Sequence, residues 1–140
     1  MRSNWFAAQT KNVVCPPFSA IGRVADQELC GAVLFNDYNG SNIEMHVWII
    51  DDKMTRQMIR DVFEYVFTRS NCNRLTVKPY RKNKAAIEFA KRLGFVFEFP
   101  MKNYYGLGKG NDAMVYRLDR ETAEGWLHGT VRHSASSTAA

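Results

Sequence analysis

Residues 18–24 and 28–35 are mostly apolar and flank a short turn, and residues 43–50 place alternate side chains on opposite faces, as β-strands do. This pattern predicts strands over residues 18–24, 28–35 and 43–50. The polar residues 25–27 separate the first two strands, and residues 36–42 (NDYNGSN) separate the second from the third. Asn39-Gly40 in this second segment tolerates positive φ, so we expect a tight turn there.

Apolar residues recur at helical spacing after residue 53. They occupy positions 58, 59, 62, 63, 66 and 67, which predicts a helix over 54–69 with a wide buried stripe. We expect a second helix between the N-cap Asn83 and the C-cap Gly94, and a third over 121–128. Further strands are predicted at 74–78, 95–99 and 113–119. The order β-β-β-α-β-α-β-β predicts an α/β or α+β fold, with a mixed central sheet flanked by helices.

A single domain accounts for the chain length of 140 residues. We expect this domain to span 1–128, and the small polar residues of 129–140 to form a disordered tail. No apolar run reaches the roughly 18 residues of a membrane span, and the start lacks the apolar stretch of a secretory signal. Three dispersed cysteines and three histidines form neither a disulfide pattern nor a metal-ligand spacing. A cytoplasmic protein without a metal is therefore expected.

Positive charge is concentrated in the middle of the chain. The net charge is +5, and residues 69–109 hold ten Lys and Arg against Glu88 and Glu98. Such a segment suits an anionic partner, either nucleic acid or a phosphorylated ligand, and equally a solvated face without a partner. Within it, residues 78–84 (KPYRKNK) mix cations with an aromatic residue, as nucleic-acid surfaces do. The charge indicates the sign of a partner and not its identity.

Four segments of the chain carry a resemblance to a known family. They are FEYVF at 63–67, NRLTV at 73–77, Asn83 with Ala86, and RLGFVFE at 92–98. On these residues, the stretch 31–118 resembles the GNAT superfamily of acetyl-CoA-dependent N-acetyltransferases. More narrowly, Thr55-Arg56 and Trp126-Leu127 are similar to short acetyltransferase-like proteins of tailed bacteriophages. The resemblance implies a GNAT-like fold with a shortened N-terminus.

The resemblance also implies where acetyl-CoA binds. In the family the pyrophosphate lies on backbone amides at the start of a helix, where unpaired N–H groups and a partial positive charge suit an anion. The pantetheine arm adds to the edge of the preceding strand, and the basic segment would serve the phosphates of the ADP moiety. The implied cofactor-binding residues are Trp48, Ile49, Ile50, Lys53, Met54, Thr55, Arg56, Asn83 and Phe89.

Two departures from the family pattern bear on turnover. Lys53 and Thr55 stand where the family carries glycines, which let phosphate approach the backbone closely. Phe89 stands where many members have a tyrosine that protonates the departing thiolate, and a phenyl ring donates no proton. The candidate substitute acids are Tyr105, Tyr104 and Tyr116. Each of them is also a common packing residue.

The family mechanism further needs a base that removes the ammonium proton of the acceptor. Alternate side chains of a strand share one face, so Glu44 and His46 lie together with Trp48 on the strand 43–50. Glu44 or His46 is therefore the candidate base, acting directly or through water. The competing interpretation is that Glu44 is solvated and that His46 is packed.

The resemblance implies transfer of acetyl from acetyl-CoA to a primary amine, on a small molecule or on a protein lysine or N-terminus, by direct attack. The departures favour an alternative, a GNAT-like protein that has lost catalysis and serves as a binding or virion-associated phage protein in the host cytoplasm. A weaker alternative is a basic nucleic-acid-binding module. The expected partners are acetyl-CoA and an amine acceptor, and a protein partner or a second copy could complete the acceptor site. Neither nucleic acid nor a membrane is an expected partner of the enzyme.

Overall fold

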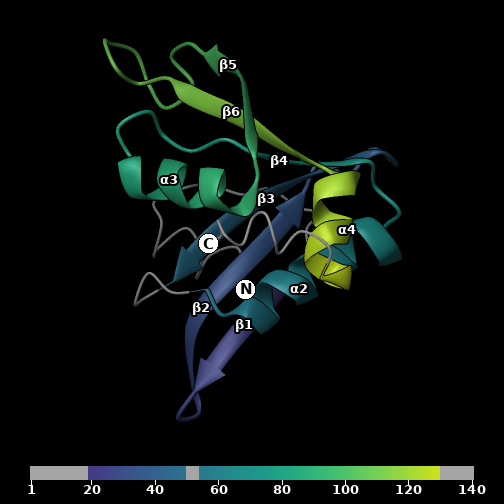
Figure 1. Cartoon of the computed structure of the whole chain (residues 1–140). Helices are drawn as coiled ribbons and strands as arrows, with labels where there is room; N and C mark the ends of the chain where they lie inside the picture. The colour runs from purple at the N-terminus through teal and green to yellow at the C-terminus, as the bar shows by residue number, and fades with distance from the viewer. Residues whose placement is uncertain (1–18, 50–53, 130–140) are drawn as a thin grey trace. The chain divides into compact units, whose positions relative to one another are not determined.

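The computed structural model describes residues 19–49 and 54–129 (Figure 1). The chain divides into two compact units, residues 1–72 and 73–140, and each unit is described by itself. Ile50, Lys53 and the predicted tail beyond Gly129 lie outside the described residues. The single domain over 1–128 and the disordered tail therefore stay predictions.

The strands of the first unit form an antiparallel meander (Figure 1). They are β1 Ser19–Ala25, β2 Glu28–Asn36 and β3 Asn42–Ile49. Asp26 and Gln27 close the first hairpin, and both have positive φ, 54° and 66°. In the second turn Asn39 Oδ1 accepts hydrogen bonds from the Ser41 N–H at 2.9 Å and the Asn42 N–H at 2.8 Å. The three predicted strands are confirmed to within about two residues of their ends.

A helix follows these strands and changes from α-helical to π-helical hydrogen bonding halfway along. It begins as α2, Arg56–Phe63, and continues as a π-helical segment η1, Glu64–Arg69. All six apolar stripe positions of the predicted helix are buried, as expected: Met58, Ile59, Val62, Phe63, Val66 and Phe67. The prediction of one continuous α-helix is wrong in its second half, where a π-helical hydrogen bond of 2.9 Å joins the Ser70 N–H to the Tyr65 carbonyl. Apolar spacing does not distinguish the two helix types over so short a segment.

The two faces of the first unit's sheet have different roles. Phe35 of β2 is buried and its ring lies 4.8 Å from that of Tyr65, so the helix covers the Phe35 face. Successive residues of a strand point to opposite faces. Leu34 therefore belongs to the other face, where it pairs in register with His46 of β3 and packs with Trp48.

The second unit is built around the strand β6, which pairs antiparallel with two neighbours. Its elements are β4 Arg74–Val77, α3 Lys84–Leu93, β5 Val96–Met101, β6 Ala113–Asp119 and α4 Arg120–His128. Strand β5 begins one residue later than predicted because the Phe95 N–H bonds to the Ala90 carbonyl at 3.0 Å and caps α3. The predicted order of strands and helices, and with it the α+β class, is confirmed.

Helix α4 packs closely on the end of α3. The Trp126 Nε1–H donates a hydrogen bond of 3.0 Å to the Leu93 carbonyl. Gly94 has φ of 108°, and a Cβ at this position would come within 2.6 Å of Thr122 Cγ2. Glycine at the end of α3 thus provides both the left-handed conformation and the space for α4.

A cluster of charged side chains links the three strands of the second unit. Glu98 of β5 accepts hydrogen bonds from Arg74 of β4 at 2.6 and 3.2 Å, and from Arg117 of β6 at 3.1 Å. Arg117 also donates to Asp119 at 3.0 Å. The carboxylate of Glu98 is therefore held between two guanidinium groups.

Candidate active site

Strand β3 brings the predicted base residues together. Glu44 Oε2 lies 3.7 Å from His46 Nε2, and the same nitrogen lies 2.9 Å from Asn36 Oδ1 of β2. Glu44 is only 3% exposed, so the interpretation of this residue as solvated is wrong. His46 is half-buried, which agrees with the interpretation of this residue as packed.

The surroundings of this pair give it acid–base capacity. A hydrogen bond to the amide oxygen of Asn36 requires a proton on His46 Nε2, which leaves Nδ1 with the basic lone pair of the neutral ring. A carboxylate that is removed from water is costly unless it has polar partners. The buried Glu44 and the half-buried His46 therefore form a pair that can hold or pass a proton.

The rest of the predicted cofactor strand is only partly described. Trp48 is half-buried and packs, with Ala20, against Ala32 and Leu34. Ile49 pairs with Gly31 in the β2–β3 register, and Ile50 lies outside the described residues. The role of this strand toward pantetheine stays a prediction.

The predicted phosphate site lies at the start of α2. Thr55 is the N-cap, and its Oγ1 accepts a hydrogen bond of 3.1 Å from the Met58 N–H. Met54 precedes the cap, so the amides of the first helical turn are those of Arg56, Gln57 and Met58. The predicted segment 53–56 thus begins ahead of the helix. No acidic residue lies in this turn, which leaves its positive end uncompensated by the helix itself.

Two predicted site residues lie on α3 of the second unit. Asn83 is exposed and caps the helix, since its Oδ1 accepts from the Ala86 N–H at 3.1 Å. Phe89 is half-buried, and the Arg92 guanidinium lies 5.7 Å from its ring centroid. The sequence of α3, KAAIEFAKRL, contains no hydroxyl or thiol side chain that could donate a proton. The tyrosine hydroxyl that Phe89 lacks is therefore not replaced by another hydroxyl on α3.

The candidate substitute acids take part in hydrogen bonding or packing within the protein. The Tyr105 hydroxyl donates to the Lys78 carbonyl at 2.6 Å, and its ring lies 5.0 Å from that of Tyr104. Tyr116 is buried, with its ring 5.4 Å from Phe97. Tyr116 is thus a packing residue, and the Tyr105 proton is used in a structural hydrogen bond.

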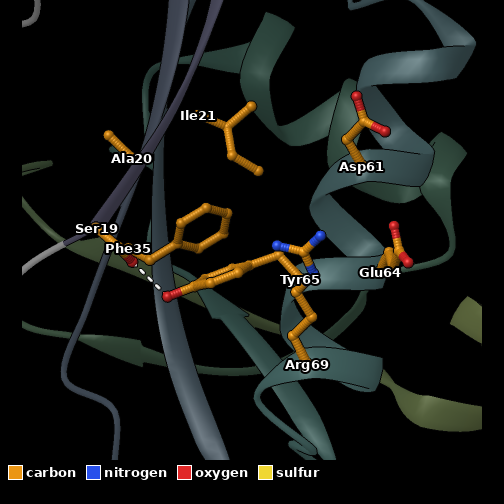
Figure 2. Close-up of a pocket in the computed structure, with 8 residues that line it drawn as sticks. All are labelled: Ser19, Ala20, Ile21, Phe35, Asp61, Glu64, Tyr65 and Arg69. Atoms are coloured by element: carbon orange, nitrogen blue, oxygen red, sulfur yellow. Dashed lines mark hydrogen bonds between the residues drawn. The ribbon is translucent and has the colours of Figure 1, made fainter.

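A pocket of about 370 Å³ lies on the helix side of the first unit (Figure 2). Its lining residues are Ser19, Ala20, Ile21, Phe35, Asp61, Glu64, Tyr65 and Arg69. The Tyr65 hydroxyl lies 2.5 Å from Ser19 Oγ, and a dashed line marks this hydrogen bond in Figure 2. The pocket is on the sheet face opposite to Glu44 and contains none of the predicted site residues. Sequence reasoning missed it because its walls come from segments about 40 residues apart, each of which reads as an ordinary strand or helix.

The described ranges hold neither a membrane-spanning helix nor a group of metal-binding side chains. No helix within 19–49 and 54–129 is long and apolar enough to cross a membrane. In the same ranges, no three His, Cys, Asp or Glu residues gather in a group that could hold a metal ion.

The structure is similar to solved acetyltransferases. One, described as a probable acetyltransferase, is 21% identical with a TM-score of 0.62, over 74% of this chain and 62% of the other. PseH, an N-acetyltransferase of Campylobacter jejuni solved in complex with acetyl coenzyme A, is 12% identical with a TM-score of 0.56, over 74% and 68%. A mutant form of spermidine N-acetyltransferase SpeG from Vibrio cholerae is 19% identical with a TM-score of 0.65, over 81% and 69%.

These similarities concern the fold. The chain spans 62% and 64% of the length of the first two solved structures that it matches. The sequence has no significant match among curated proteins.

The comparison with family models identifies the family of the chain, whereas the solved structures identify only its fold. The family model described as acetyltransferase (GNAT) domain matches residues 2–96. The match covers more than half of the chain and includes β3, the start of α2 and the whole of α3. The chain therefore belongs to the GNAT acetyltransferase family.

Proposed function

We propose that this protein transfers the acetyl group of acetyl-CoA to a primary amine, with Glu44 and His46 as its proton-accepting pair. The observation that carries the proposal is the buried carboxylate of Glu44, 3.7 Å from the imidazole of His46 on β3. Membership of the GNAT family supports acetyl transfer as the reaction class. PseH, one of the solved structures with this fold, binds acetyl coenzyme A.

The reaction needs one proton to leave the acceptor before its nitrogen can attack. Glu44 or His46 takes this proton from the ammonium group, directly or through one water molecule. The amine nitrogen then forms a bond to the thioester carbonyl carbon, and the carbon–sulfur bond breaks. The products are the N-acetyl amine and the CoA thiolate, and the second proton of the nitrogen is lost as the amide forms.

The thiolate needs no protein acid in this scheme. A thiol has a pKa of about 8.5, so its thiolate is a stable leaving group near neutral pH and takes a proton from water after release. This route agrees with the absence of a hydroxyl or thiol side chain on α3. Tyr105 can serve as the acid only if its hydrogen bond to the Lys78 carbonyl opens.

The start of α2 is the proposed pyrophosphate site. The amides of Arg56 and Gln57 and the guanidinium of Arg56 supply donors and positive charge. Asn83 and the basic segment, which the family pattern assigns to the cofactor, stay predictions.

The test begins with calorimetric titration of acetyl-CoA, with CoA as the companion ligand. We expect micromolar binding, followed by enzymatic release of CoA thiol in a screen of small primary amines and lysine peptides. His46→Gln should bind acetyl-CoA as well as the parent protein does and release CoA more slowly. Binding without turnover on any amine would contradict the proposal.

A second candidate function is a GNAT-like binding protein without catalysis, including a virion-associated one. The observation that favours it is the Thr55 cap, whose Oγ1 occupies the Met58 amide that a phosphate would otherwise use. Absence of heat and of any thermal shift with millimolar acetyl-CoA would support this function and contradict the first one.

A further inference from the structure

Two loops of the second unit are tied together by hydrogen bonds. Residues 78–83 precede α3, and residues 102–112 join β5 to β6. The Tyr105 hydroxyl donates to the Lys78 carbonyl at 2.6 Å, and the Tyr80 hydroxyl donates to Asn111 Oδ1 at 3.3 Å. A backbone bond of 3.0 Å from the Arg81 N–H to the Asp112 carbonyl adds a third link. The two loops therefore form one continuous surface.

Three tyrosines meet on this surface. The Tyr105 ring lies edge-on to Tyr104 at 5.0 Å and to Tyr80 at 5.6 Å. Tyr104 is 43% exposed and Tyr105 is 38% exposed, so large aromatic groups remain in contact with water. Tyr104 and Tyr105 come from the loop 102–112, which contains three glycines and which we call the glycine-rich loop.

Cations surround the tyrosines. Lys78 Nζ lies 5.3 Å from the Tyr104 ring centroid. Lys82 packs on the glycine-rich loop, since a Cβ at Gly110 would come within 2.8 Å of Lys82 Cε. The two loops and the first residue of α3 carry six cations: Lys78, Arg81, Lys82, Lys84, Lys102 and Lys109. We call these residues and the three tyrosines the tyrosine–lysine surface.

Little negative charge opposes these cations. Asp112 is the single acidic residue in the two loops. Its carboxylate is almost buried, accepts from the Asn103 N–H at 3.1 Å, and lies 3.7 Å from the Arg81 guanidinium. The surface is therefore strongly positive, and its one carboxylate is engaged within the protein.

The arrangement suits one type of anion more than others. A small anion is bound by donors that converge on one point. Here the cations are spread along two loops, and exposed rings lie among them. Backbone phosphates need spread cations, and unstacked bases need exposed aromatic rings.

We propose that the tyrosine–lysine surface binds single-stranded nucleic acid. Tyr104 provides the stacking platform, and the lysines of both loops contact the phosphates. The sequence motif at 78–84 offered one aromatic residue among cations, and the structure adds two more from a loop some 20 residues away. The proposal does not depend on acetyl transfer.

The test is fluorescence anisotropy of a labelled oligo(dT) of about 16 nucleotides, titrated with the full chain at several salt concentrations. We expect binding that weakens steeply as salt rises. Tyr104→Ala should weaken it about tenfold, because one stacked base is lost, and Tyr104→Phe should retain it. Lys109→Gln should reduce the slope of log affinity against log salt concentration by about one, as expected for one lost phosphate contact. The matched control Lys91→Gln, near the far end of α3, should leave this slope unchanged.

Several results would overturn the proposal. No anisotropy change at low salt would exclude nucleic acid. Equal effects of Lys109→Gln and Lys91→Gln would mean diffuse attraction by net charge and no defined surface. Complete displacement of the oligonucleotide by an equimolar amount of acetyl-CoA would assign these cations to the phosphates of the cofactor instead.

Discussion

Glu44 in the first unit and Glu98 in the second are two carboxylates on strands, and their neighbours differ. Glu44 is buried beside one imidazole, with Asn36 as that ring's further partner. Glu98 lies between Arg74 and Arg117 and accepts bonds from both. The hydrogen bond from Arg74 is the largest cause that holds the pKa of Glu98 below its usual range, and Arg117 adds to the effect against the partial burial.

This difference is the one that we expect between a structural carboxylate and the proposed base. A guanidinium keeps its own proton at any ordinary pH, so Glu98 has no partner with which to exchange a proton. An imidazole gains and loses a proton near neutrality, so Glu44 has such a partner. Burial alone does not indicate a base, and the neighbour must be able to titrate as well.

The largest effect that we expect is from Glu44→Gln. Loss of the base should lower kcat/KM for CoA release at least about a hundredfold, with acetyl-CoA affinity unchanged. Glu98→Gln is the matched control, since it makes the same change in a carboxylate without a titratable partner, and it should change the rate less than about threefold. Equal losses in both variants would show that the comparison of the two carboxylates does not hold.

The second effect concerns the start of α2. Arg56→Glu places a negative charge at the proposed pyrophosphate site and should weaken acetyl-CoA binding at least about tenfold in calorimetry. Arg60→Glu makes the same change one turn further along the helix, where the field of the helix end has decayed, and should have a small effect. Unchanged affinity in a folded Arg56→Glu protein would remove this residue from the site.

A third experiment sharpens the comparison through pH. Because the folded-state pKa of Glu98 is lowered, its contribution to stability is present above the ordinary value of 4.5 and is lost as pH falls through the folded-state pKa. Glu98→Gln should therefore lower the free energy of unfolding by about 1 kcal/mol at pH 7, and by progressively less as the pH is lowered below 4.5. Urea titrations at pH 7 and at a series of lower pH values measure this, and a difference that stays constant with pH would contradict the assigned cause.

The smallest effect is expected at Thr55. Thr55→Ala removes the cap and should cost about 1 kcal/mol of stability, whereas Thr55→Gly should cost only a few tenths. Thr55→Gly also frees the Met58 N–H and restores a glycine of the family pattern, so acetyl-CoA affinity should rise about threefold. Lower affinity in Thr55→Gly would mean that the threonine itself contacts the cofactor.

Much of the fold could be predicted from local signals. Apolar segments bounded by turn residues placed the first two strands, alternation placed the third, and the caps Asn83 and Gly94 marked the limits of α3. These features are properties of neighbouring residues, which a single sequence contains. The π-helical segment could not be predicted, because the apolar stripe of Val66 and Phe67 is compatible with either helix type.

The candidate site was predicted less completely. The shared face of Glu44 and His46 follows from strand alternation, but the burial of Glu44 depends on tertiary packing that no local pattern encodes. The Tyr105 hydrogen bond to the Lys78 carbonyl joins residues 27 apart, so the use of its proton was also hidden. Binding of the cofactor by β3, by Asn83 and by Phe89 remains a prediction.

The tryptophans make the folding of the two units separately visible. Trp48 is half-buried in the first unit against Ala32 and Leu34, and Trp126 is tied by its ring N–H to the Leu93 carbonyl in the second. With Trp5 replaced, Trp48→Phe and Trp126→Phe proteins each emit fluorescence from one unit alone. Coincident unfolding curves would mean that both units melt as one cooperative domain, and separated curves would mean that each unit has its own transition.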